Sequence, residues 1–213
     1  MIIKEKSIKS YVALERVLQY IFTKDVEDKS FVFKRFIKGD RMFVKQLEAT
    51  SDIETRSMIT EKRLNNMVQQ YKNNDKVRLF KRKGETKFYH CILSFHTSDK
   101  LTQKQLLLTA KQYAKKRFPK SMVVATSHLD TEHQHIHLVG SNVEYGLGTT
   151  RYLSKKEFSQ IKQDMEKWQD KELNLVYSRI NHSKKKSSPL VKMPNIKSTY
   201  KESKVKNRRL HSL

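Results

Sequence analysis

The chain has 213 residues and a formal net charge of +23, so a polyanion is the expected partner, with nucleic acid ahead of an anionic membrane surface. No apolar run approaches the roughly 20 residues that a membrane-spanning helix needs, and the opening residues Met-Ile-Ile-Lys-Glu-Lys lack the apolar core of a secretory signal. A single cysteine, Cys91, excludes an intramolecular disulfide and fits a reducing compartment, so we expect a cytoplasmic protein with no membrane insertion.

The first half of the chain predicts a mixture of strands and helices. Apolar residues at three- and four-residue steps predict helices, while alternation of apolar and polar residues predicts strands. We expect strands at 2–8, 30–37 and 87–95 and helices at about 12–22 and 61–72. The segment 38–86 looks expanded, and we interpret it as an insertion or a segment that contacts DNA.

The second half contains clearer helix signals. Thr102 is suited to cap a helix that Phe118-Pro119 ends, and Ser154 with Glu157 three residues later forms a capping-box pattern. The short apolar run at 121–126 predicts a buried strand that ends at His128. We also expect strands at 133–141 and 173–180.

These elements predict an α+β fold with a central antiparallel sheet that carries a histidine hairpin and has helices packed mainly on one face. We expect one domain over residues 1–180. Residues 181–213 lose hydrophobic periodicity and contain ten Lys and Arg against one acid, Glu202. They predict a flexible basic tail that could grip phosphates without reading sequence.

Four of the eight histidines fall within ten positions, at 128, 133, 135 and 137. If 133–141 is a strand, His133, His135 and His137 share one face, and a short turn brings His128 beside them. Converging imidazoles form a divalent-metal site, with His128, His135 and His137 as the expected ligands. Imidazole ligands suit zinc, manganese, cobalt or nickel, and the residues alone do not identify the metal. His133 could compete as a ligand.

A metal site in a very basic protein is suited to polarising a phosphodiester. The nucleophile could be a bound water, as in a hydrolytic nuclease, or a side chain that forms a covalent intermediate. Tyrosines are plentiful, and Tyr20, near the end of the first predicted helix, is better placed for presentation than Tyr11 at its start.

The motifs resemble those of HUH-type conjugative relaxases, particularly the MobP-like mobilisation class. The histidine block reads H-x-D-x-x-x-x-H-x-H from His128 to His137 and is followed by Asn142. Residues 88–96, with the helix and strand after them, are similar to the family's second motif, and residues 7–21 are similar to its first. Together the three blocks span roughly residues 7–180.

The resemblance implies a site- and strand-specific nicking enzyme. Tyr20 would attack a phosphate of single-stranded DNA at an origin of transfer and keep it as a 5′-phosphotyrosine. His128, His135 and His137 would bind a divalent ion (Mn, Mg or Zn), and Asp130 would hold one of these histidines in its tautomer. Accessory relaxosome and coupling proteins would be further partners.

Two other functions fit the same residues. One is a rolling-circle replication or transposition nuclease, although in those proteins the tyrosine usually follows the histidine motif. The other is a non-catalytic basic DNA-binding module whose histidines hold a structural metal.

Overall fold

The computed structural model describes residues 1–23, 32–38, 53–129 and 132–179, all within one compact unit, Met1–Ser183. The strands are β1 Ile2–Ile8, β2 Val32–Arg35, β3 Phe88–Ser94, β4 Ser121–His128 and β5 His135–Glu144; the helices are α1 Tyr11–Thr23, α3 Ile53–Lys76, α4 Gln103–Arg117 and α5 Lys155–Glu172. The predicted α+β class with an antiparallel sheet that carries the histidines is confirmed.

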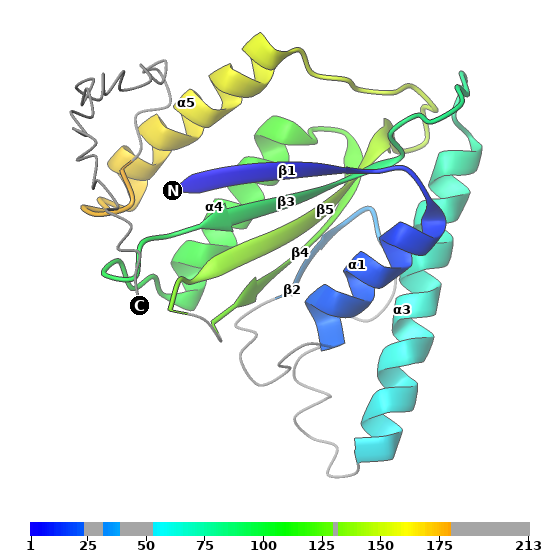
Figure 1. Cartoon of the computed structure of the whole chain (residues 1–213), viewed down its shortest axis with the longest axis horizontal. Coiled ribbons are helices and arrows are strands. Elements are labelled where there is room, and N and C mark those ends of the chain that lie inside the picture. Colours follow the sequence, from blue (N-terminus) through cyan, green and yellow to red (C-terminus); the bar gives the residue numbers. More distant parts are fainter. Residues whose placement is uncertain (24–31, 39–52, 130–131, 180–213) are drawn as a thin grey trace, which may run out of the picture. The chain divides into compact units, whose positions relative to one another are not determined.

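The five strands lie in the order β1-β3-β5-β4-β2, and every neighbouring pair is antiparallel (Figure 1). β5 is the central strand, with β3 on one side and β4 on the other, so its backbone is hydrogen-bonded along both edges. Every residue of β4 is buried, as is all of β5 except its two end residues. The histidine-bearing strands are therefore the most firmly held part of the sheet.

Helices cover both faces of the sheet, whereas the sequence predicted packing mainly on one. On one face α4 and α5 bury a core that includes Leu93, Ile136 and Leu138. On the other, α1 and α3 pack over a second core around Phe88 and Val139 (Figure 1). The difference arises from α3, whose Leu64, Met67, Val68 and Tyr71 are buried and need a partner surface. That second core lies on the sheet face that carries His135 and His137, around Val139 and Phe88.

The capping signals at Thr102 and Ser154 are confirmed, and each forms a complete capping box. The predicted strand at 173–180 is wrong, since residues 173–179 form turns and bends with Asn174 at φ 50°. Asp99 accepts hydrogen bonds from the backbone N–H groups of residues 176–178. These donors are thereby bound to a carboxylate instead of a neighbouring strand.

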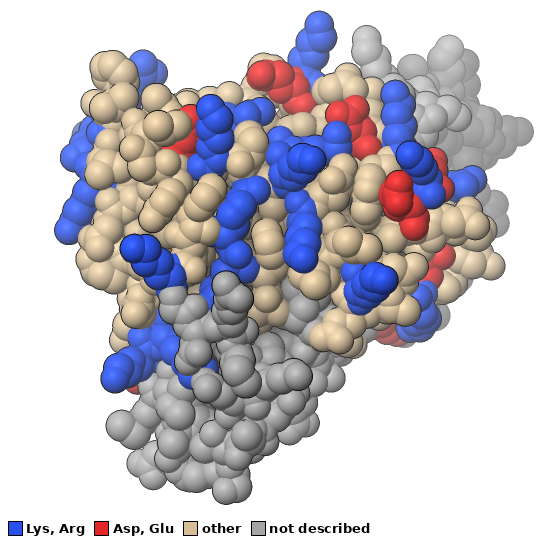
Figure 2. Space-filling model, turned by 180° about the vertical axis from the view of Figure 1, so that it is seen from behind, with Lys and Arg blue, Asp and Glu red and all other residues tan. Residues whose placement is uncertain are grey.

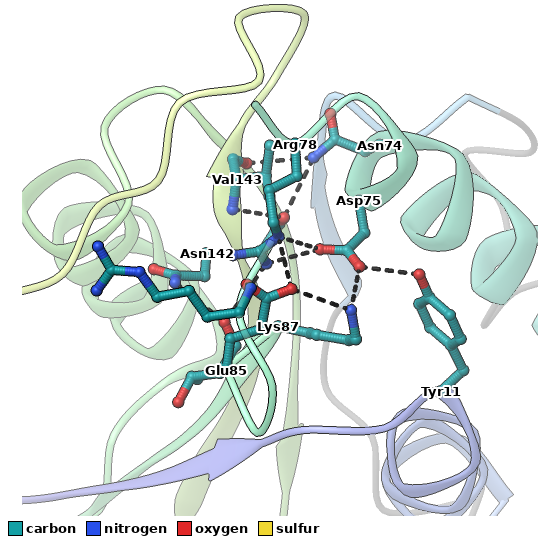
Figure 3. Close-up of polar contacts among 11 residues, drawn as sticks. Tyr11, Asn74, Asp75, Arg78, Glu85, Lys87, Asn142 and Val143 are labelled. Atoms are coloured by element: carbon teal, nitrogen blue, oxygen red, sulfur yellow. Dashed lines mark hydrogen bonds and ion pairs between the residues drawn. The ribbon is translucent and has the colours of Figure 1, made fainter. Parts of the chain in front are cut away.

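A buried charge network joins α1, α3 and the start of β3 (Figure 3). The Asp75 carboxylate accepts hydrogen bonds from Arg78 at 2.6 Å, from Lys87 at 2.8 Å and from the Tyr11 hydroxyl at 2.8 Å. Burial would raise the pKa of Asp75, but the hydrogen bonds from Lys87 and Arg78 outweigh it, so its pKa lies below the usual value. The network fixes the start of α1 against the end of α3.

We expect Asp75→Asn to lower the free energy of unfolding by about 1.5–3 kcal/mol, because it weakens the charge-assisted hydrogen bonds of the buried Arg78 and leaves it paired with the more distant Glu85 carboxylate, at 3.4 Å. The pKa of Asp75 is lowered in the folded protein, so its ionised carboxylate stabilises the fold at any pH above the ordinary carboxyl pKa. That stabilisation is lost as the pH falls through the lowered pKa of the folded state. The difference between variant and parent in urea unfolding should therefore shrink in acid. The matched control Asp164→Asn removes a half-exposed pair with Lys116 and should cost about 0–1 kcal/mol. Equal losses from both variants would contradict this account.

Candidate active site

The β4–β5 register brings the three predicted histidine ligands together. His128, the last residue of β4, pairs directly with His135, the first of β5, and His137 lies two residues further along the same face. One ring nitrogen from each of these three histidines lies within 4.8 Å of the others, and the ring centroids are 4.6–5.3 Å apart. His128 and His137 are buried and His135 is half-buried.

The second ring nitrogen of each histidine has an acceptor close by. His128 Nε2 lies 3.0 Å from the Ile21 carbonyl oxygen, and His135 Nδ1 lies 2.9 Å from the His133 carbonyl oxygen. A carbonyl can only accept, so these nitrogens carry the protons and donate. The lone pairs then lie on His128 Nδ1 and His135 Nε2. Neutral imidazoles with the opposite N–H held in this way are the usual ligands of a protein-bound transition metal, so the cluster fits such an ion.

His90 is a functional candidate that the sequence did not reveal. It lies on β3, and its Nε2 is 2.8 Å from His137 Nδ1, with both side chains buried. Burial, with repulsion from Lys6 and His128, lowers the pKa of His90 to about 4, so its ring is neutral near neutral pH. Neutral His90 can accept the Nδ1 proton of His137, which puts the His137 lone pair on Nε2. Only the β3–β5 register could have revealed this contact.

Tyr20 lies beside the histidine cluster. It belongs to the last turns of α1, is 43% exposed, and has its ring centroid 5.7 Å from that of His137 and 5.9 Å from that of His128. The carbonyl of the next residue, Ile21, accepts from His128, so the end of α1 is tied to the cluster. An exposed phenol over these imidazoles is positioned to reach a substrate that they hold.

Tyr11 lies at the opposite end of α1, about 13 Å away at 1.5 Å per residue. Its hydroxyl donates to Asp75. Burial and the Asp75 carboxylate raise the pKa of Tyr11, which disfavours the phenolate that a nucleophile needs. Tyr11 therefore has a structural position in the network of Figure 3.

The remaining motif residues have different positions. β5 begins at His135, two residues later than predicted, so His133 does not share the strand face; its Nδ1 instead lies 3.0 Å from the Phe95 carbonyl oxygen. Asp130 lies outside the described residues. Asn142 is buried near the other end of β5, where its amide donates to the Thr86 carbonyl at 3.1 Å, so it secures the loop before β3.

An antiparallel sheet with a histidine cluster on one face and a tyrosine beside it defines a candidate nuclease site. The family model for the relaxase MobA/VirD2-like nuclease domain matches residues 43–172, more than half of the chain. The chain therefore belongs to the relaxase family, whose members nick DNA and bind single strands. The match contains all three clustered histidines but begins after Tyr11 and Tyr20.

No curated protein compared with the chain is detectably similar to it. Among the described residues, no helix is both long and apolar enough to cross a membrane.

We expect His135→Ala to abolish most uptake of Mn²⁺ or Zn²⁺, because it removes one of three converging nitrogens. His133→Ala should leave uptake unchanged, since the His133 ring contacts the Phe95 carbonyl. Isothermal titration of both variants with each metal separates the two histidines. Full uptake by His135→Ala, or its loss in His133→Ala, would contradict the ligand set.

For His90 we expect His90→Ala to weaken metal affinity by about 10- to 100-fold, as loss of a ligand's hydrogen-bond partner usually does. His90→Gln keeps an acceptor oxygen near the former Nε2 position and should restore most of the affinity. Thermal unfolding of the metal-free variants controls for stability. If His90→Gln were as weak as His90→Ala, the hydrogen bond to His137 would have no part in metal binding.

Proposed function

We propose that this protein is a site- and strand-specific relaxase that nicks single-stranded DNA at an origin of transfer and so starts conjugative mobilisation. The observation that carries the proposal is the exposed Tyr20 ring less than 6 Å from the rings of His128 and His137, in a chain of the relaxase family.

In the proposed reaction the Tyr20 hydroxyl oxygen forms a bond to the scissile phosphorus, and the bond from phosphorus to the 3′ oxygen breaks. The phenol proton passes to solvent, and the leaving oxygen takes up a proton to become a 3′-hydroxyl. The 5′-phosphate stays on Tyr20. One phosphoester replaces another, so the reverse reaction can rejoin DNA without a nucleotide cofactor.

His128, His135 and His137 would hold a divalent ion, and such an ion, when bound, stabilises negative charge on the phosphate oxygens. The chain's own residues orient the histidine rings and present the tyrosine. His90 and the carbonyls of Ile21 and His133 orient the imidazoles, and the sheet holds them in place before substrate arrives. The last turns of α1 present the phenol.

The charge distribution supports a nucleic-acid substrate. Figure 2 shows Lys and Arg side chains spread over the face seen from behind, with fewer Asp and Glu among them. Helix α4 contains no acid, and its Lys104, Lys111 and Lys115 are exposed. Phosphate contacts of this kind bind strands without reading sequence, so affinity should fall with salt, at a slope of about −0.7 per phosphate neutralised. Accessory relaxosome and coupling proteins would then supply further specificity and the motor.

We expect Tyr20→Phe to lose the covalent protein–DNA adduct, with cleavage reduced about 10³-fold or more, while DNA affinity stays within about twofold. The assay incubates labelled single-stranded oligonucleotides from the element's own transfer origin with Mn²⁺ or Mg²⁺ and looks for a shifted band that survives denaturant. Tyr11→Phe is the matched control from the same helix and should keep the adduct.

An adduct retained in Tyr20→Phe would refute the nucleophile. Absence of any metal-dependent cleavage by the parent protein would favour a non-catalytic DNA-binding module. Cleavage without an adduct would point to attack by water.

A further inference from the structure

Exposed apolar side chains gather at the end of the sheet opposite the histidines. They come from the loop after α3, from the turn after β5 and from the residue after β2, and we call them the distal surface. Its members are Phe36, Val77, Leu79, Phe80, Tyr145 and Leu147, with 41–79% of each side chain exposed. Phe80 is the most exposed of them, at 79%. Large exposed apolar side chains in one area usually mark a binding surface.

The distal surface is held in place by contacts between its segments. The Leu79 N–H donates to the Gly148 carbonyl at 3.0 Å, which joins the two loops; they lie side by side in Figure 1. Gly148 has φ +73°, and a Cβ there would lie 2.2 Å from the Val77 carbonyl oxygen, so only glycine permits this approach. The Phe36 and Tyr145 rings stack at 4.9 Å with an angle of 2° between their planes.

The charges around the distal surface are mainly positive. Lys81, Arg82 and Lys83 directly follow Phe80 and are exposed, and the Arg35 guanidinium lies 5.8 Å from the centre of the Phe36 ring. The nearby Glu85 carboxylate is engaged by Arg78 and Lys87. Exposed flat rings among cations suit a partner that offers both phosphates and unpaired bases, which is single-stranded nucleic acid. An acidic protein segment would match the charge but would leave the stacked rings unexplained.

We propose that the distal surface is a second binding site for the DNA strand that is cut at the histidine cluster, and that it stacks unpaired bases about five to ten nucleotides from the scissile phosphate. The inference rests on the proposed function for the position of the cut. The spacing comes from β5, which runs from His135 to Glu144 and therefore spans about 30 Å at roughly 3.4 Å per residue. A single strand that keeps the duplex rise advances about 3.4 Å per nucleotide and an extended one roughly twice as far, so the distance corresponds to about five to ten nucleotides.

The test uses fluorescence anisotropy with labelled oligo(dT) of 4 and 30 nucleotides, without added metal. In the parent protein the longer strand can reach both ends of the sheet, so we expect it to bind at least about tenfold more tightly per site than the shorter one. Phe80→Ala with Tyr145→Ala should remove most of that preference, because each stacked ring stabilises a base. Leu108→Ala, an exposed apolar residue on α4, is the matched control and should keep it.

Single Phe80→Ala provides a check on folding, since its side chain is nearly all in solvent, and it should give part of the loss. A preference for the 30-mer that the double variant leaves unchanged would overturn the inference and point to a protein partner instead. Failure of the proposed function would look different, because cleavage would be missing in the parent while the length preference and its loss remained.

Discussion

The antiparallel pairing of β4 with β5 is the constraint on which the candidate site depends. It sets His128 opposite His135 and puts His137 on the same face two residues on. β5 is hydrogen-bonded on both edges, so the histidines are held by the most constrained backbone in the sheet. A slip of one residue in β5 would turn its histidines toward α4 and α5 and bring Ile136 and Leu138 out of their core. Burial of that apolar surface therefore specifies the geometry of the histidine cluster.

Helix α1 links the site to the rest of the fold at both of its ends. At its start Tyr11 is bound to the Asp75 network, and at its end the Ile21 carbonyl accepts from His128. Between them Leu14 and Leu18 are fully buried against α3. Tyr20 is an exposed residue of the last turns, so its place over the imidazoles follows from the contacts of its buried neighbours Leu18 and Ile21. The two tyrosines of this helix thus have different surroundings, Tyr11 in the buried network and Tyr20 beside the imidazoles.

Much of this arrangement follows from local sequence patterns. Strand alternation predicts that His135 and His137 share a face, and capping residues predict α4 and α5. The contact between His90 and His137 could not be predicted, because it depends on which strands are neighbours and in what register. His133 was misplaced because a strand's first residue is set by pairing, and here pairing begins at His135. The expected strand at 173–180 failed because Asp99 takes its backbone donors.

The histidine cluster and the distal surface lie at opposite ends of the central strand β5, which runs from His135 to Glu144. At the His135 end, three imidazoles, two of them buried, lie beside an exposed phenol. At the Glu144 end lie exposed rings and cations. Binding energy that stabilises the uncut strand and the transition state equally does not speed bond exchange in the bound complex. Under the proposed second binding site, affinity would come from bases stacked some 30 Å from the ester bond that is exchanged, so binding and cleavage would depend on separate residues.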